Sequence, residues 1–357
     1  MRMAMGLLGM PKTSSSVGIV DSPAPGRPPD SNEALHPLLL PVLGRLRVDD
    51  FQSGEVIARE LGVSRASVHG LLRDAASYGV RVQTVPGRGY RLTRPFEPLD
   101  EVRLAAGLAP VGLHVLCQPE VDSTNARLLA LAAAGAPHGL LLAAEWQTAG
   151  RGRRGRDWRG ILGAGLAFSL LWRFERPAAA LSGLSLAVGV ALVRAMRAMG
   201  AAGVGLKWPN DVLAGEDKLA GILIELTGDM LGPAAAVIGI GINVRAGEAL
   251  SERVGVPVAD LEAACGQRLD RNAVLVEVAR ELAAVLNTFD RQGFAAFRSE
   301  WESLHVWQGR PVAIHAADGR VVYGRAAGVD AQGALLLDTG AWLTPILSGD
   351  VSLRRAV

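Results

Sequence analysis

The stretch Gly150–Trp158 reads Gly-Arg-Gly-Arg-Arg-Gly-Arg-Asp-Trp, and five arginines fall within residues 151–159. Glycine lets a backbone approach a ligand closely and adopt positive φ. Arginine forks match pairs of phosphate or carboxylate oxygens. The stretch therefore predicts a loop that closes over a polyanion such as a nucleotide. A basic patch for RNA, or a flexible linker, is the plainer alternative, because short motifs often match by chance.

A second polar stretch, Lys207-Trp208-Pro209-Asn210-Asp211, follows a strand-like run. The short oxygen-bearing side chains of Asn210 and Asp211 could hold Mg²⁺ and so gather the phosphates of ATP. An Asx turn after proline is the plainer interpretation. Lys218 opens the apolar run Lys218–Leu226, where an ammonium group is costly without an anionic partner. The alternative is a strand-end lysine that extends to water.

Two further stretches end or begin elements that could bind a ligand. Ser123, Thr124 and Asn125 precede a helix-like run at 126–133, so they are either helix caps or ligand contacts. The run Gly239–Asn243 reads Gly-Ile-Gly-Ile-Asn, a strand whose small residues permit close approach. It does not match a dinucleotide fingerprint, which needs a third glycine and a following helix.

The central part of the chain alternates strand-like and helix-like segments, which predicts a mixed α+β core. Asp270 or Asn272 is expected to cap the second of two long helices. The predicted strands are 140–146, 166–172, 204–208, 218–226 and 235–244, and the predicted long helices are 178–199 and 272–289.

Residues 34–95 predict a winged helix-turn-helix unit for DNA. Ser53 and Ser64 begin two short helices, and a hairpin at 80–92 follows as the wing. Residues 45–92 hold eight arginines and five acidic residues, a charge of +3. Gly70 costs about 1 kcal/mol inside the second helix, and Pro41 is expected to kink the helix before these two. The candidate DNA contacts are Ser64, Arg65, Ser67, His69, Arg73 and Arg88.

The two ends of the chain differ from the core. Residues 1–33 contain five prolines and no aromatic residue, so a disordered tail is expected. Short β-type runs between 308 and 353, separated by turn residues, predict a small separate β-barrel.

The composition limits the possible function classes. The chain has 357 residues, which predicts two or three domains, and 49% of them are hydrophobic. With 37 basic and 35 acidic residues the net charge is +2, so any nucleic-acid site must be local. The two cysteines cannot make a disulfide framework or a four-cysteine zinc site, which indicates a reducing cytoplasm. The longest uncharged run in the body of the chain, 177–193, is shorter than a membrane-spanning helix.

The order of these motifs resembles biotin protein ligase, and with the winged helix it resembles the bifunctional ligase and biotin-operon repressor. The motifs are Ser-Thr-Asn, the Arg/Gly stretch, Lys-Trp-Pro-Asn-Asp, Lys-Leu-Ala-Gly-Ile-Leu with its later Glu, and Gly-Ile-Gly-Ile-Asn. The resemblance covers the chain from about residue 38 onward. It implies a winged helix over 34–95, a class II synthetase-like ligase core over 110–303 and an SH3-like barrel over 306–357.

The resemblance also implies the reaction: ATP and biotin form biotinyl-5′-AMP, and biotin then passes to a lysine of the carrier domain of acetyl-CoA carboxylase. It implies Mg²⁺, operator DNA and a ligand-dependent homodimer. Lys218, Arg153 and Arg151 are the expected catalytic residues. The expected biotin contacts are Ser123, Thr124, Asn125, Gln147, Arg151, Gly152, Arg153, Lys218 and Gly221. The expected ATP contacts are Arg153, Arg156, Trp158, Lys207, Asn210 and Asn243, with Asn210 and Asp211 near the metal.

This sequence departs from the family pattern at two places. The second helix of the helix-turn-helix contains Gly70 and no lysine, so the resemblance does not imply a particular operator sequence. The segment 244–266 has no aromatic residue, whereas repressor members have a loop that packs over the adenine, in some with a tryptophan. Three alternatives remain open: a biotin-sensing regulator without ligase activity, a ligase whose winged helix no longer binds DNA, and a lipoate or octanoate ligase.

Overall fold

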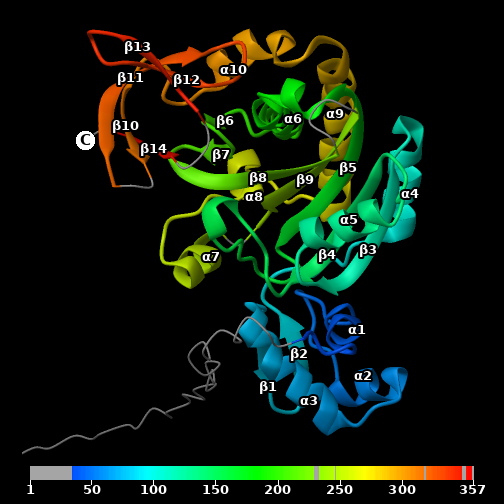
Figure 1. Ribbon diagram of the computed structural model, residues 1–357. Helices are drawn as coiled ribbons and strands as arrows, with labels where there is room; N and C mark the ends of the chain where they lie inside the picture. The colour runs from blue at the N-terminus through cyan, green and yellow to red at the C-terminus, as the bar shows by residue number, and fades with distance from the viewer. Residues whose placement is uncertain (1–33, 229–232, 246, 317–318, 348–350, 356–357) are drawn as a thin grey trace, which may run out of the picture.

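The computed structural model describes residues 34–228, 233–245, 247–316, 319–347 and 351–355. Three units follow one another along the chain: a small N-terminal unit, a large central unit and a C-terminal β unit (Figure 1). The mixture of helices with a large mixed sheet confirms the predicted α+β class. The tail predicted over residues 1–33 lies outside the described residues.

The N-terminal unit has the predicted helix-turn-helix and wing. Its helices are α1 (Leu39–Leu43), α2 (Gly54–Leu61) and α3 (Arg65–Asp74). A 3₁₀ turn (Ala75–Tyr78) leads to the hairpin of β1 (Val82–Val85) and β2 (Gly89–Leu92). The Ser64 hydroxyl caps α3 by accepting from the Ser67 N–H, as the sequence predicts.

The prediction that Pro41 kinks its helix was wrong. Helix α1 has five residues and begins at Leu39, so Pro41 lies in its first turn. The N–H groups of the first turn have no partner inside a helix, so a proline there removes no hydrogen bond. Pro37 lies in the turn before α1.

The central unit is built on a seven-stranded sheet in the order β3-β4-β5-β9-β8-β7-β6. Strands β3 and β4 are parallel and the other described neighbours are antiparallel. The strands are β3 (His114–Val121), β4 (Leu140–Gln147), β5 (Gly165–Pro177), β6 (Val204–Lys207), β7 (Asp211–Ala214), β8 (Asp217–Gly228) and β9 (Pro233–Asn243). The β6–β7 hairpin was not predicted; it converts the Lys-Trp-Pro-Asn-Asp stretch into a tight turn inside the sheet.

Both faces of this sheet are covered by helices. Alternate residues of one strand enter opposite cores, since strand side chains alternate in direction: Leu170 joins the main core and Leu171 the smaller core beside Leu128 of α5. Helices α6 and α9 pack against each other on the main-core side. The helices of this unit are α4 (Glu101–Leu108), α5 (Thr124–Ala133), α6 (Leu184–Ala198), α7 (Gly247–Val254), α8 (Leu261–Cys265), α9 (Arg271–Gln292) and α10 (Arg298–Leu304).

One long predicted helix is divided. Residues 178–181 form a 3₁₀ turn, and α6 begins only at Leu184 after Gly183. Gly183 has φ +81°, and a Cβ there would lie 2.6 Å from the Phe294 ring. The chain therefore breaks where only glycine fits against Phe294. The other long helix, α9, is continuous, and Asp270 caps it by accepting from Asn272 and Ala273.

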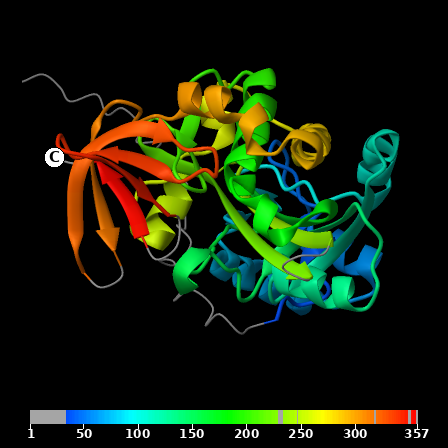
Figure 2. The ribbon, with the colours of Figure 1, turned by 45° about the horizontal axis from the view of Figure 1, so that its top comes forward.

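The C-terminal unit is a five-stranded antiparallel sheet in the order β13-β12-β11-β10-β14, which corresponds to the small β unit predicted there (Figure 2). Its strands are β10 (Pro311–Ala316), β11 (Val321–Val329), β12 (Leu335–Asp338), β13 (Leu343–Ile346) and β14 (Val351–Arg355), and β14 was not predicted. The Trp208 indole N–H donates to the Gly333 carbonyl at 3.1 Å, so the β6–β7 turn is tied to this unit.

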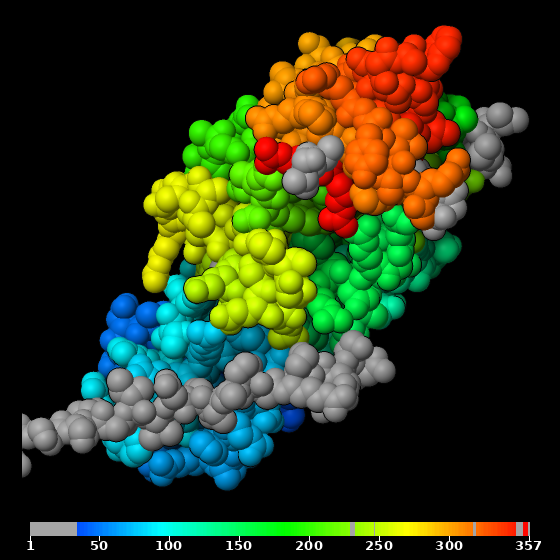
Figure 3. Space-filling view, turned by 90° about the vertical axis from the view of Figure 1, so that its left-hand side faces the viewer, coloured from blue at the N-terminus to red at the C-terminus, as the bar shows by residue number. Residues whose placement is uncertain are grey.

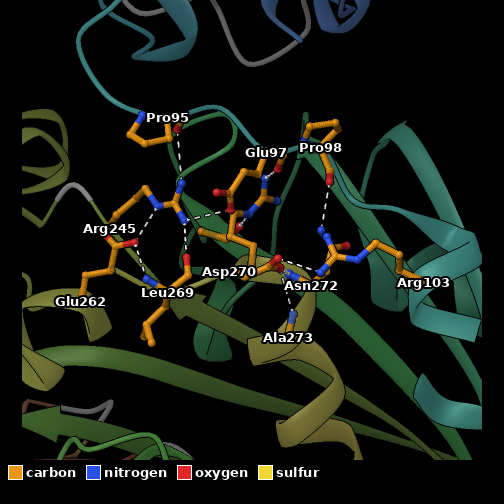
Figure 4. A network of polar contacts seen from close by, with 12 residues as sticks. Pro95, Glu97, Pro98, Arg103, Arg245, Glu262, Leu269, Asp270, Asn272 and Ala273 are labelled. Carbon is orange, nitrogen blue, oxygen red and sulfur yellow. Dashed lines mark hydrogen bonds and ion pairs between the residues drawn. The ribbon is translucent and has the colours of Figure 1, made fainter. Parts of the chain in front are cut away.

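The segment between the winged helix and the core, residues 95–100, is fixed by hydrogen bonds to buried side chains (Figure 4). Arg245 donates to the Pro95 carbonyl, and Asn272 donates to that of Pro98. Arg271, which is fully buried, donates to the Glu97 carbonyl and pairs with Glu145 at 2.9 Å. Buried guanidinium groups are costly unless they are fully bonded, so this segment is a rigid part of the core.

The winged helix also contacts the core directly. The Tyr78 and Trp146 rings meet edge to face, and the Leu162 N–H donates to the Tyr78 carbonyl. Arg253 of α7 donates to the Ser77 carbonyl. Figure 3 shows the α7–α8 segment (yellow) between the N-terminal and C-terminal units. Among the described residues, none of the helices is both long enough and apolar enough to cross a membrane.

His305 provides a test of the packing between α10 and the sheet. Its ring stacks on Trp301 and is 4% exposed, and burial lowers its pKa from 6.5 to about 4. Between these pH values the unfolded chain binds the proton more strongly, so stability falls as pH drops from about 6.5 to 4. His305→Phe has no titrating group at this position. Between pH 6.5 and 4 we therefore expect its free energy of unfolding to fall by about 3 kcal/mol less than that of the unmodified protein. The measurement is urea unfolding at several pH values. Identical pH profiles for the two proteins would contradict this account.

Candidate functional site

Most of the predicted site residues line one cleft on the central sheet, with about 450 Å³ of space. Its walls come from the start of α5, the ends of β4 and β7, the strands β8 and β9, and the Arg/Gly loop between β4 and β5. We call this cleft the first compartment. Its predicted members are Ser123, Thr124, Asn125, Gln147, Arg151, Gly152, Arg153, Trp158, Asn210, Lys218 and Gly221. Gly239, Ile240 and Gly241, from the run expected to permit close approach, also line it, and Ile222 and Leu223 were not among the expected site residues.

The Arg/Gly loop folds back on itself. The Trp158 N–H donates to the Gly150 carbonyl, and the Gly152 N–H donates to the Arg156 carbonyl. A Cβ on Gly150 would lie 2.5 Å from the Trp158 carbonyl oxygen, so glycine is required for this closure. The returning turn places Arg151 and Arg153 on the sheet side and Trp158 over the sheet.

Two glycines of neighbouring strands form a flat platform for Trp158. Gly221 of β8 and Gly241 of β9 are direct partners in the sheet. A Cβ on Gly241 would lie 2.2 Å from the Trp158 ring, and one on Gly221 would lie 3.1 Å from it. The alternate glycines of the Gly-Ile-Gly-Ile-Asn run therefore permit the close approach that the sequence suggested, and the group that approaches here is the indole.

The floor of the compartment is a buried hydrogen-bonded network. Gln147 Oε1 accepts from the Thr124 N–H at 2.8 Å. The Ser169 hydroxyl, fully buried on β5, lies 2.8 Å from the Thr124 hydroxyl and 2.6 Å from Asn125 Oδ1. The Ser123 hydroxyl caps α5 by accepting from the Ala126 N–H, so the helix-cap interpretation also holds for that residue. A network with every member bonded holds its groups rigidly.

Lys218 is paired inside the cleft. Its Nζ lies 2.6 Å from Asp211 Oδ1 and 5.6 Å from the centre of the Trp158 ring. Asn210 Oδ1 accepts from Arg153 at 3.3 Å, and Asn210 Nδ2 donates to the Ile222 carbonyl. The oxygens of Asn210 and Asp211 thus face cationic groups, and no cluster of three metal-ligating side chains is found among the described residues. As they stand, these two residues do not form a cation site.

A second compartment adjoins the first across Trp158 and Gln147, with about 510 Å³ of space. Asn243, predicted on the adenosine side, lines it together with Arg245 and Leu250. The Asn243 amide donates to the carbonyls of Lys218 and Ala259, so it joins β8 to the 244–266 segment. That segment contains α7 and α8, and it brings the aliphatic side chain of Leu250 and the guanidinium of Arg245 to the compartment.

Two predicted nucleotide contacts lie outside both compartments. Lys207 Nζ lies 5.0 Å from the centre of the Trp307 ring, and burial lowers the pKa of this lysine. Arg156 lines a separate exposed hollow with Arg154, His315 and Arg354, between the loop and the C-terminal sheet. This hollow is strongly cationic and continues the positive charge of the loop.

The first compartment is suited to holding an anion. The charged groups that line it are Arg151, Arg153 and Lys218. Arg151 and Lys218 are paired with Glu225 and Asp211, two carboxylates that lie outside this lining. Its remaining walls are apolar strand residues and the polar floor. Such a site can bind a small carboxylic acid beside a phosphate and exclude water beneath a loop.

Two polar residues that contact the site, Ser169 and Glu225, were not among the expected site residues, although each stands out in the sequence. Ser169 is the lone hydroxyl in the apolar strand 166–172, and Glu225 is the lone carboxylate in the run 219–226. A single polar residue in an otherwise apolar buried strand needs a partner. Here both contact Asn125, at 2.6 Å and 2.8 Å.

The candidate DNA-binding residues are all exposed on the N-terminal unit. Ser64, Arg65, Ser67, His69 and Arg73 are exposed on α3 or at its cap, and Arg88 is exposed in the wing. His69 Nδ1 lies 3.1 Å from the Tyr90 hydroxyl, which joins α3 to β2. The guanidinium groups of Arg88 and Arg91 lie over the Phe51 ring at 4.6 and 4.7 Å.

Comparison with known families matches three parts of the chain. Residues 118–243 match the Biotin/lipoate A/B protein ligase family, residues 309–354 the Biotin protein ligase C terminal domain, and residues 42–91 an HTH domain.

Similar proteins cover most of the chain. The bifunctional ligase/repressor BirA of Escherichia coli is 39% identical over 89% of this chain and 97% of its own length. The biotin–[acetyl-CoA-carboxylase] ligase of Mycobacterium tuberculosis is 37% identical over 71% of this chain and 95% of its own. The structure of biotin protein ligase from Aquifex aeolicus in complex with biotin and ATP is 33% identical, with a TM-score of 0.59, over 68% of this chain and 99% of that one.

The glycine platform can be tested by crowding it. Gly241→Ala places a methyl group where the Trp158 ring lies. We expect the free energy of unfolding to fall by about 1–3 kcal/mol, the usual cost of overpacking. In a Trp158→Ala background the same substitution should cost little, because the clash is gone. Equal costs in both backgrounds, measured by denaturant unfolding, would contradict the platform.

Proposed function

The chain belongs to the family of bifunctional biotin protein ligases and repressors, and on that premise we propose how its own residues divide the work. The chain is an ATP-dependent biotin ligase with a DNA-binding helix-turn-helix domain. The observation that best supports a retained ligase reaction is the first compartment, where three cations meet a rigid polar floor beneath the Arg/Gly loop.

In the first step the biotin carboxylate attacks the α-phosphorus of ATP, and pyrophosphate leaves. Two anions must approach each other, so the repulsion has to be neutralised at the reacting atoms. We assign this role to Lys218 and Arg153, with Arg151 ordering the loop. Their amino and guanidinium groups line one compartment, which is the arrangement that the role requires.

In the second step the amine of an acceptor lysine attacks the acyl carbon of biotinyl-5′-AMP. The amide bond forms, AMP leaves and the amine loses a proton. The mixed anhydride is sensitive to water until the acceptor arrives, so a loop that closes over it protects it. The acceptor we propose is the biotin carboxyl carrier domain of acetyl-CoA carboxylase.

In this proposal biotin binds in the first compartment and the adenosine of ATP binds in the second. Ser123, Thr124, Asn125, Gln147, Gly152 and Gly221 form the biotin side of the first compartment. Trp158 and Asn210 border the phosphates, and Asn243 borders the adenosine in the second compartment. Lys207 and Arg156 are not in either lining and would contribute through charge alone.

We propose that Mg²⁺ enters as the counter-ion of ATP, and we assign it no protein ligand. The predicted ligands, Asn210 and Asp211, are engaged with Arg153 and Lys218. Binding a cation there would require these contacts to break.

We propose that the work is divided along the predicted domain boundaries. Residues 34–95 would read operator DNA, 110–303 would carry the ligase site, and 306–357 would support the acceptor step. A ligand-bound homodimer would present two helix-turn-helix units to two half-sites. The free cysteines Cys117 and Cys265 agree with work in the cytoplasm.

Experiment would distinguish this function from two others: a biotin sensor and a lipoate or octanoate ligase. A biotin sensor without ligase activity would have no need for Lys218 and Arg153 in the compartment. A lipoate or octanoate ligase would place an alkyl chain where the polar floor of Gln147, Thr124 and Asn125 lies. This floor offers hydrogen bonds that suit the ureido ring of biotin better than an alkyl chain.

Lys218→Ala tests the ligase assignment. We expect adenylate formation to slow by roughly 10²–10³-fold, because the compartment loses a cation at the reacting phosphate. Lys218→Arg, which keeps the charge but not the ammonium geometry, should recover part of the rate. The measurement is biotin-dependent ATP–pyrophosphate exchange, and near-normal exchange in Lys218→Ala would remove Lys218 from this role.

Arg65→Ala tests the DNA-binding assignment. We expect biotin plus ATP to tighten binding of the full chain to promoter DNA of biotin-synthesis genes, measured by gel shift at one stated salt concentration. Arg65→Ala should weaken that binding about tenfold and leave biotin transfer unchanged. Arg59→Ala, an exposed arginine of α2 paired with Glu55, is the matched control. Absence of a ligand-dependent shift in the unmodified protein would indicate a ligase whose winged helix no longer binds DNA.

A further inference from the structure

Glu225 is the later glutamate of the Lys-Leu-Ala-Gly-Ile-Leu motif, and none of the roles assigned above uses it. It follows Gly221 and Leu223 on β8 at two-residue spacing, so it shares their side of the sheet. Gly221 and Leu223 line the first compartment, and Glu225 lies just beyond its end. The side chain is 28% exposed, so water screens its charge only in part.

One oxygen of Glu225 joins two parts of the molecule that are far apart in the sequence. Glu225 Oε2 accepts from Asn125 Nδ2 at 2.8 Å and from Arg151 Nη2 at 3.0 Å. Asn125 belongs to the buried start of α5, and Arg151 to the exposed Arg/Gly loop. The carboxylate therefore links the floor of the compartment to the loop above it.

The floor end of this link is rigid. Asn125 Oδ1 accepts from Ser169, and Nδ2 also donates to the Leu223 carbonyl at 3.2 Å. A Cβ on Gly239 would lie 2.1 Å from Asn125 Oδ1, so the strand beneath leaves room for this amide alone. Both ends of the Asn125 amide are thus fixed, and Glu225 is held by a partner that cannot move with the loop.

At the other end of this link, side chains attach the Arg/Gly loop to the sheet. The loop's backbone hydrogen bonds at Gly150, Gly152 and Arg153 are made within the loop itself. It attaches to the sheet through the Arg151–Glu225 pair, the Arg153–Asn210 contact and the Trp158 ring on its glycines. The Arg151–Glu225 pair is a charge-assisted hydrogen bond, and such bonds are about twice as strong as neutral ones.

We propose that Glu225 is a positioning residue that holds the Arg/Gly loop against the floor of the first compartment through Arg151. By holding Arg151 against Asn125, Glu225 keeps the loop in place above the acid and its adenylate. It touches no reacting atom; its effect is on how long the adenylate is shielded from water. This inference rests on the proposed function for its second test and is independent of it for the first.

The first test needs no ligand and no activity. Limited trypsin digestion of the full chain reports how often the loop opens, because the loop contains several arginine sites. We expect Glu225→Gln to speed cleavage within residues 151–156 by about two- to fivefold, the range for loss of a partly exposed charged pair. Glu216→Gln, whose carboxylate pairs with Arg355 on the surface, is the matched control and should leave the rate unchanged.

A double-mutant cycle assigns the effect to the pair. Arg151→Gln should speed cleavage at the remaining loop sites as much as Glu225→Gln does, and the double variant should be no faster than either. Equal cleavage rates for Glu225→Gln and the unmodified protein, or additive effects in the double variant, would overturn the proposal. If Glu225→Gln does not fold, Glu225→Asp takes its place, because it keeps the charge and withdraws it from Arg151.

The second test follows the fate of the adenylate. With biotin and ATP, Glu225→Gln should release several times more free AMP per biotin transferred, since the loop opens before the acceptor arrives. Its pyrophosphate exchange at saturating biotin should stay within about twofold of normal, unlike that of Lys218→Ala. A fall in exchange as large as that of Lys218→Ala would place Glu225 in the chemistry and overturn the positioning role. If no acid supports exchange at all, the proposed function fails, and the trypsin result still decides the role of Glu225.

Discussion

The need to bring two anions together at one point constrains most of this structure. A carboxylate can attack a phosphate only where cations offset the repulsion, and those cations must also be stable before the anions arrive. The fold meets both demands by giving the arginines and the lysine of the cleft a neighbour: Lys218 lies against Asp211, Arg151 against Glu225, and Arg153 against Asn210. Each pair is an interaction that a substrate can compete with.

The rest of the central unit holds these pairs at a fixed distance. Strands β8 and β9 carry glycines where the indole and the Asn125 amide approach the backbone. The buried Ser169 hydroxyl joins Thr124 to Asn125, so the start of α5 and the sheet form one surface. The position of the Arg/Gly loop is then set by side chains instead of by backbone pairing with the sheet.

Much of this site could be predicted from the sequence because the motifs are local. The Arg/Gly stretch, Ser-Thr-Asn, Gln147, Lys218 and Gly221 indeed line one compartment. What could not be predicted depends on contacts between distant segments. The pairing of Lys218 with Asp211 needs the β6–β7 hairpin, and the break before α6 needs Phe294 beside Gly183. Pro41 was misjudged because its effect depends on where the helix begins.

The central claim is that this cleft activates biotin with ATP. The most direct test is ATP–pyrophosphate exchange by the purified chain with Mg²⁺, comparing biotin, lipoate and octanoate at equal concentration. The account predicts exchange with biotin and none above background with the two other acids. Tight biotin binding without exchange would make the protein a sensor, and exchange with lipoate or octanoate in place of biotin would assign the cleft to a different acid; either result would contradict the account.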